Sequence, residues 1–120
     1  MKRYHPNYLK ESVFFSCSTC HSHLVSQNDI ISKAFEGMHG PAFLVEKVIN
    51  MSRGQREDRM LLTGTHTVAD ISCQICRSVI GWIYIKAPAK NQKYKEGKCI
   101  IEKTRVIKEC NKLSMSVYIG

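Results

Sequence analysis

The six cysteines are the side chains with the most distinctive chemistry in this sequence, and four of them form two Cys-x-x-Cys pairs. Cys17 and Cys20 make the first pair, and Cys73 and Cys76 make the second. Two thiolates three positions apart on a tight turn can direct both sulfurs at one ion, and two such turns supply the four ligands, at about 2.3 Å, of a tetrahedral zinc. One pair alone would also fit a thioredoxin-like redox motif, but two pairs in so short a chain favour a metal over disulfides. We therefore predict one zinc ion held by these four cysteines; the pattern favours zinc over an iron–sulfur cluster without excluding the cluster.

The predicted zinc is structural, because four protein ligands leave no coordination position for an activated water. Zinc binding contributes about 10–16 kcal/mol in small modules, which matches or exceeds the roughly 5–15 kcal/mol net stability of a whole domain. The metal would tie the N-terminal region to the middle of the chain, so we expect Cys73→Ser to unfold or aggregate. His21 and His23 lie beside the first pair and could compete as ligands, but we favour exposed loop positions for both. Cys99, in an apolar run, is expected to pack in the core.

The elements that position these cysteines are predicted to be mainly strands, because apolar and β-branched residues occur in short runs rather than with helical spacing. Strands are expected at residues 13–15, 23–25, 42–51, 60–63, 67–71, 79–86, 98–102 and 104–108. Turn-forming or charged residues predict loops or turns at residues 26–40, 51–58 and 87–97. Residues 113–118 are expected to form a last edge strand or a frayed end. In the strand at residues 79–86, we expect Ile80, Trp82 and Tyr84 on one face and Ile83 and Ile85 on the other.

Length and composition indicate one small domain of an intracellular protein. The chain has 120 residues, 43% of them hydrophobic, and no low-complexity tract, which suits one modest core. No apolar run approaches the roughly 20 residues of a membrane span, and the basic N-terminal residues lack the apolar core of a secretory signal. The net charge of +8 comes from dispersed Lys and Arg, with a looser concentration over residues 86–112. We expect a solvated face there and do not expect nucleic-acid binding.

Four further stretches accompany the cysteine pairs, at residues 31–37 (ISKAFEG), 61–71 (LLTGTHTVADI), 81–84 (GWIY) and 92–98 (QKYKEGK). Together they resemble the yippee-like family over about residues 12–102. The resemblance implies a mainly β fold, the β-tent, in which two antiparallel sheets are pinned by one structural zinc. The cereblon thalidomide-binding domain, the Mis18 centromere proteins and B-type methionine sulfoxide reductases have similar folds. The expected organisation is a yippee zinc-binding domain at residues 12–110, an N-terminal extension at 1–11 and a C-terminal tail at 111–120.

The resemblance also implies a function, that of a non-enzymatic binding or adaptor module in intracellular protein complexes. The expected partners are proteins, in some members a ubiquitin-ligase assembly, in the nucleus and cytoplasm, with no membrane. We predict a pocket walled by Trp82, Tyr84, Phe43 and Phe35 and completed by His66, because aromatic walls bind apolar or cationic groups. The cereblon domain has a cage of three tryptophans, whereas this chain has one tryptophan. Two alternatives stay open: Trp82 as a plain core residue, and His66 as a satisfied buried histidine or one that orients backbone near a cysteine.

An enzyme of the methionine sulfoxide reductase kind is the alternative function. Such a reductase attacks the sulfoxide with a late-strand cysteine followed shortly by Asn, and Cys110-Asn111 is faintly similar. Lys108 and Lys112 could lower the thiol pKa, as a nucleophile requires. The surroundings of Cys110 lack the Arg-aromatic-Cys-apolar-Asn pattern of those reductases, so we expect no enzymatic activity.

Overall fold

The computed structural model describes residues 7–111, which are built almost entirely from antiparallel strands. The smaller sheet has the order β2-β1-β9 and contains β1 (Val13–Cys17), β2 (His23–Ser26) and β9 (Val106–Cys110). The larger sheet has the order β3-β4-β8-β7-β6-β5 and contains β3 (Ile30–Gly37), β4 (Gly40–Val45), β5 (Met51–Leu61), β6 (Gly64–Cys73), β7 (Val79–Lys86) and β8 (Cys99–Glu102). Three short 3-10 helices, η1 (Gln27–Asp29), η2 (Lys90–Lys95) and η3 (Lys103–Arg105), lie between strands. The predicted fold class, mainly β with two antiparallel sheets, is confirmed.

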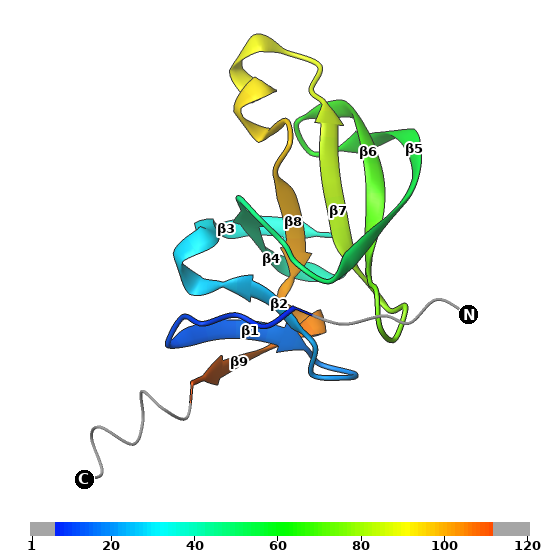
Figure 1. Cartoon of the computed structure of the whole chain (residues 1–120). Helices are drawn as coiled ribbons and strands as arrows, with labels where there is room; N and C mark the ends of the chain where they lie inside the picture. Colours follow the sequence, from blue (N-terminus) through cyan, green and yellow to red (C-terminus); the bar gives the residue numbers. More distant parts are fainter. Residues whose placement is uncertain (1–6, 112–120) are drawn as a thin grey trace, which may run out of the picture.

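The main core lies between the two sheets. In Figure 1 the three strands of the smaller sheet lie together at the bottom of the view, with β5 to β8 rising above them. Phe15 and Leu24 of the smaller sheet pack with Phe43, Ile71 and Ile83 of the larger one. The rings of Phe15 and Phe43 are 5.0 Å apart between centroids. This inter-sheet core therefore depends on how the two sheets are placed relative to each other. Strand β1 of the smaller sheet and strand β6 of the larger sheet each lead into a cysteine turn at their C-terminal ends.

A second apolar cluster covers the opposite face of the larger sheet, because successive side chains of a strand alternate between faces. Trp82, Tyr84 and Leu44 are buried in it, and Phe35 and Leu61 are partly buried against it. Strands with both faces covered are apolar almost throughout, as β7 is. No helix among the described residues is long and apolar enough to cross a membrane.

Two of the predicted loops are strands in the structure. Residues 26–40 contain η1 and β3, and residues 51–58 lie inside the single long strand β5. Strands β3 and β5 are the two edges of the larger sheet, and most of their side chains are half-buried or exposed. Edge strands commonly carry charged residues that discourage pairing with another chain, so the polar sequence concealed these strands. The predicted strand at residues 42–51 ends at Val45, and the tail at 113–118 lies outside the described residues.

The predicted faces of β7 need one correction, at Ile80. Ile71 of β6 pairs with Gly81, but the next residue of β6, Ser72, pairs with Val79, which leaves Ile80 as an extra residue in the ladder. Such a bulge changes the face on which the following side chains lie. Ile80 therefore belongs to the inter-sheet core with Ile83, and not to the cluster of Trp82.

Candidate functional site

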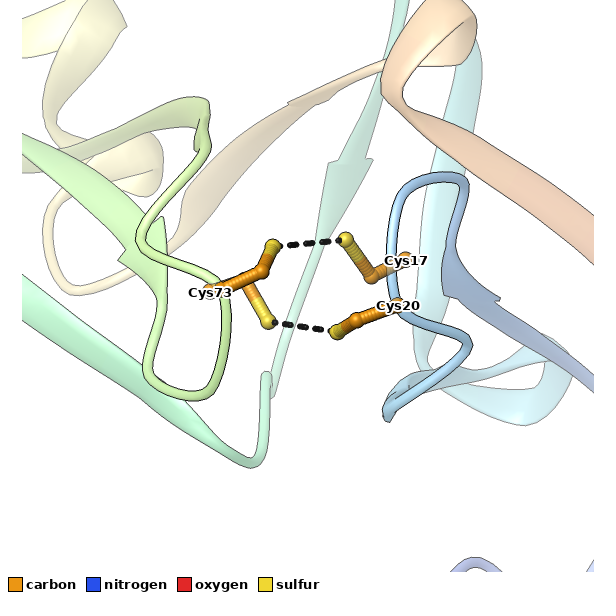
Figure 2. A group of neighbouring side chains, drawn as sticks. Cys17, Cys20 and Cys73 are labelled. Carbon is orange, nitrogen blue, oxygen red and sulfur yellow. Dashed lines mark hydrogen bonds between the residues drawn. The ribbon is translucent and has the colours of Figure 1, made fainter.

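The two Cys-x-x-Cys pairs meet in the structure and form one cluster of four sulfurs. Cys17 Sγ lies 3.5 Å from Cys76 Sγ, and Cys20 Sγ lies 3.5 Å from Cys73 Sγ. All four sulfurs lie within 4.8 Å of one another. Figure 2 shows Cys17 and Cys20 on one loop, facing Cys73 on the opposite loop. Four sulfurs at about 2.3 Å from a tetrahedral zinc would be about 3.8 Å apart, so the donor set and its spacing fit this metal.

The two cysteine turns share one backbone geometry. In the first, Cys17 N donates to Ser22 O and His21 N donates to Cys17 O, both at 2.8 Å. The same two contacts recur at 2.8 Å in the second turn, between Cys73, Ser78 and Arg77. His21 and Arg77 take equivalent left-handed conformations, with φ of 64° and 68°. Each turn thus begins where a strand ends, and it directs its cysteine side chains at the other turn.

Each turn also places a serine hydroxyl on a sulfur. Ser22 Oγ lies 3.1 Å from Cys20 Sγ, and Ser78 Oγ lies 3.2 Å from Cys76 Sγ. A hydroxyl that donates to a metal-bound thiolate holds its orientation and spreads its charge. Neither serine was predicted from the sequence, although the repeated pattern Cys-x-x-Cys-x-Ser indicates an equivalent position in both turns.

The thiols of Cys17, Cys73 and Cys76 hold their protons unequally. Burial raises the pKa of Cys17, and it raises the pKa of Cys73 to about 12. For Cys76, burial acts upward, but hydrogen bonds from Ser78 and the neighbouring sulfurs of Cys17 and Cys20 together lower the pKa to about 6. A bound cation favours every thiolate, so zinc must displace the protons that Cys17 and Cys73 otherwise keep at neutral pH.

The other candidate ligands lie outside the cluster. His23 accepts a hydrogen bond from Leu9 N through Nδ1 at 2.9 Å, and its ring packs on Phe14. Neither His21 nor His23 is in the group of potential ligands found among residues 7–111. Cys99 is buried in the inter-sheet core, where burial raises its pKa to about 11, while Cys110 is exposed on β9.

A cavity of about 640 Å³ opens on the outer face of the larger sheet, over the second apolar cluster. Phe35, Trp82 and Tyr84, three of the candidate pocket residues, line it. The other lining residues are Ala34, Glu36, Gly37, Met38, Arg59, Met60, Leu61, Leu62, Thr63, Gln92, Tyr94 and Lys95. They come from β3 and the turn after it, from β5 and the turn after it, and from η2.

Phe43 and His66 do not line this cavity, which corrects two of the predicted pocket positions. Phe43 lies on the inter-sheet face of β4, because its neighbours Ala42 and Leu44 occupy the outer face. His66 is fully buried beside Tyr84, with ring centroids 5.3 Å apart. Its Nδ1 lies 3.0 Å from the carbonyl oxygen of Gly64, so this nitrogen carries the proton and donates.

Lys95 is the buried charged residue among the cavity residues that were not predicted from the sequence. Its side chain is buried, with 4% of the residue exposed, and its Nζ donates to Thr63 Oγ1 at 3.1 Å. The ammonium lies over three aromatic rings, 5.4 Å from Phe35, 5.5 Å from Tyr84 and 5.9 Å from Tyr94. Burial lowers the pKa of Lys95. Among several lysines in a polar loop, nothing local in the sequence distinguishes this one.

Trp82 and Tyr84 form the floor of the cavity. The guanidinium of Arg59 lies 5.8 Å from the Trp82 ring and forms ion pairs with Glu57 and, at 3.0 Å, with Asp70. Within the described part of the chain, the Trp82 indole N–H has no acceptor within hydrogen-bonding geometry. Burial raises the pKa of the Tyr84 hydroxyl to about 12, and the nearby Trp82 indole N–H lowers this pKa by a smaller amount.

Comparisons with known proteins agree with this geometry. A family model described as Yippee zinc-binding/DNA-binding /Mis18, centromere assembly matches residues 13–114. The chain is 53% identical over 95 residues to a yippee-like protein of Arabidopsis thaliana, covering 79% of this chain and 90% of the relative. It is 48% identical over 95 residues to human protein yippee-like 3, covering 79% and 80%. The crystal structure of the Mis18 'Yippee-like' domain matches with a TM-score of 0.67 and 14% identity, covering 84% of this chain and 98% of that one, and so supports the fold. This chain belongs to the yippee-like family, and its four-cysteine cluster is the zinc site of a yippee zinc-binding domain.

Proposed function

We propose that this protein is a non-enzymatic binding module whose cavity receives a group from a partner protein. The observation that carries the proposal is the cavity of about 640 Å³ with its aromatic wall. Its volume lies within the roughly 300–1,000 Å³ of ligand sites, and its mixture of aromatic surface and a few polar groups is typical of them. In this proposal the zinc holds the fold, and the outer face of the larger sheet does the binding.

The rim of the cavity supports a protein as the partner. Four large apolar side chains there are exposed to solvent: Met38 at 65%, Met60 at 76%, Leu62 at 90% and Tyr94 at 55%. Exposed apolar side chains gathered around a cavity mark interaction surfaces. Methionines suit such a surface because their flexible thioethers adapt to a partner's shape. A partner that covers this rim would remove several apolar side chains from water at once.

The zinc centre supports a structural role in this scheme. Its four protein ligands fill a tetrahedral shell, so no position remains for an activated water. Cys17 ends β1 of the smaller sheet and Cys73 ends β6 of the larger sheet. The metal therefore joins the two sheets at the edge of their shared core.

The reductase alternative receives no support from the position of Cys110. A nucleophilic thiol acts from a site that also holds its substrate, whereas Cys110 is exposed on the edge strand β9 and does not line the cavity described above. A turnover assay with a methionine sulfoxide and a dithiol reductant tests this directly. Turnover that Cys110→Ser abolishes would replace the binding module with the enzyme.

A pull-down with rim variants tests the binding function. Met60→Asp combined with Leu62→Asp places two charges on side chains that are already exposed, so the fold should tolerate them. We expect loss of the partner proteins that the wild-type chain captures from a nuclear and cytoplasmic extract. The control is Ile107→Ser on β9, which leaves the rim intact. Equal capture by the wild type and the double variant would refute the proposal.

Two further predictions rest on the family resemblance. Identification of the captured proteins by mass spectrometry tests whether a ubiquitin-ligase assembly is among the partners, and immunoblots of separated nuclear and cytoplasmic fractions test a location in both.

A further inference from the structure

The buried ammonium of Lys95 indicates the charge of the group that the cavity binds. A lysine removed from water is costly unless a carboxylate pairs with it. Among residues 7–111 no carboxylate forms an ion pair with Lys95, whose neighbours are the Thr63 hydroxyl and three aromatic faces. Arg59, the other cation of the cavity wall, is already neutralised by Glu57 and Asp70.

Aromatic walls that bind apolar or cationic groups were expected from the sequence, and the structure places the chain's own cation, Lys95, among the rings. The rings of Phe35, Tyr84 and Tyr94 each have Lys95 Nζ within 6 Å of their centroids. A second cation there would meet repulsion from a charge that is poorly screened by water. The cavity therefore favours an anion beside the aromatic rings.

We propose that the cavity binds the C-terminal carboxylate of a partner polypeptide whose last residue is apolar, with Lys95 as the ion-pair partner. This rests on the proposed binding function and specifies its ligand. The carboxylate would give Lys95 the counter-ion that it lacks among the described residues, and charge-assisted hydrogen bonds of this kind are the strong ones. The apolar side chain of the terminal residue would lie against Phe35 and Tyr84, and the preceding residues would cover the rim at Met60 and Leu62.

A chain end fits the site better than an internal Asp or Glu. An internal acidic residue brings peptide N–H and C=O groups into the cavity on both sides of its side chain, and each needs a hydrogen-bond partner. Three aromatic faces surround the Lys95 ammonium, so the peptide groups that flank an internal acidic residue would meet ring faces there. Glu36 also lines the cavity, but its side chain is exposed, so its repulsion of an incoming carboxylate is screened by solvent.

The test measures binding of matched peptides to the zinc-loaded full chain. The probes are N-acetylated hexapeptides ending in Leu, Ile, Val, Phe or Met, each made as the free acid and as the C-terminal amide. The chain has one tryptophan, so the NMR signal of the Trp82 indole N–H reports unambiguously on the cavity. We expect at least one free acid to shift this signal and to bind about ten- to a hundredfold more tightly than its amide.

Two variants of η2 show whether Lys95 supplies the preference. Lys95→Met keeps a long apolar side chain and removes the charge, and should reduce the ratio of acid to amide affinity to about one. Lys93→Met is the matched control, because Lys93 lies two residues away on η2 with an exposed side chain, and should keep the wild-type ratio. Full zinc content and an unchanged melting profile would establish that both variants are folded.

Three results would overturn the inference. Equal binding of acids and amides would show a cavity that binds peptides without reading charge, leaving the proposed function intact. Equal binding of an amidated peptide with an internal Glu would place the carboxylate on a side chain instead of the chain end. Probes that leave the Trp82 signal unmoved would refute terminal-carboxylate recognition; if the rim variants in the pull-down also kept their partners, the binding function would fail with it.

Discussion

Gly81→Ala should be among the most destabilising single substitutions in this chain, and the expected loss of unfolding free energy follows from one distance. A Cβ at Gly81 would lie 1.8 Å from the carbonyl oxygen of Ile100 on the neighbouring strand, whereas ordinary van der Waals contacts begin near 3.4 Å. Strands β7 and β8 would have to separate by about 1.6 Å, a third of the roughly 4.8 Å spacing between paired strands. The clash is with backbone, so rotation of a side chain cannot relieve it.

Separation at this position would break the ladder in the middle of the larger sheet. Gly81 pairs with Ile101 and Trp82 pairs with Ile100, and β7 and β8 are both interior strands. Leaving about two buried backbone groups unpaired costs about 1–3 kcal/mol for each. We therefore expect Gly81→Ala to lose about 2–6 kcal/mol of unfolding free energy, which is a large part of the stability of a small domain.

The assay is urea unfolding at a fixed excess of free zinc, followed by circular dichroism and by the fluorescence of the single tryptophan. Gly54→Ala is the matched control, since Gly54 also lies in the larger sheet but its added Cβ would approach no atom closer than 3.6 Å. That variant should stay within about 1 kcal/mol of the wild type. A loss below about 1 kcal/mol for Gly81→Ala, or an equal loss for both variants, would refute the reasoning.

Three further predictions concern the metal and the buried lysine. Chelation of zinc, or Cys73→Ser, should unfold the domain, as measured by loss of the strand signal in circular dichroism; a folded Cys73→Ser protein with one equivalent of zinc would contradict this. Ser22→Ala and Ser78→Ala should each weaken zinc binding at least about tenfold in competition with a colorimetric chelator, whereas Ser52→Ala, at an exposed position, should leave it unchanged. Burial lowers the pKa of Lys95 below its ordinary 10.5, so the unfolded chain binds that proton more tightly and stability should rise with pH from the lowered value to about 10.5. Urea unfolding measured across this pH range should show no such rise in unfolding free energy from residue 95 in Lys95→Met, whereas Lys93→Met should keep it.

The metal centre could be predicted from the sequence because its signal is local. Each short turn supplies two of the four ligands, so the simplest way to complete a tetrahedral shell is for the two turns to come together. In the structure they do, and Cys17 and Cys73 lie in one cluster. The strand that follows the second pair was also predicted with its observed bounds, Val79–Lys86. Here β-branched and aromatic residues fill both faces of an interior strand, so propensity and burial agree.

The predictions failed where tertiary placement overrides local pattern. Strands β3 and β5 form because their backbones complete the edges of the sheet, while their polar side chains give no alternation to detect. The face of Ile80 depends on a bulge that is defined only by pairing with β6. Lys95 is buried because η2 folds over the face of β7, a long-range contact that the composition of the loop does not encode.

The zinc site and the cavity lie on opposite faces of the larger sheet, yet the second cysteine turn connects them. This turn ends β6 at Cys73 and leads into β7 at Val79. The bulge at Ile80 follows directly and puts Ile80 into the inter-sheet core, so that Trp82 and Tyr84 face the cavity. A slip of one residue in this register would exchange the two faces of the strand. By holding the turn that starts β7, the metal helps to fix the register that places Trp82 and Tyr84 in the wall of the cavity.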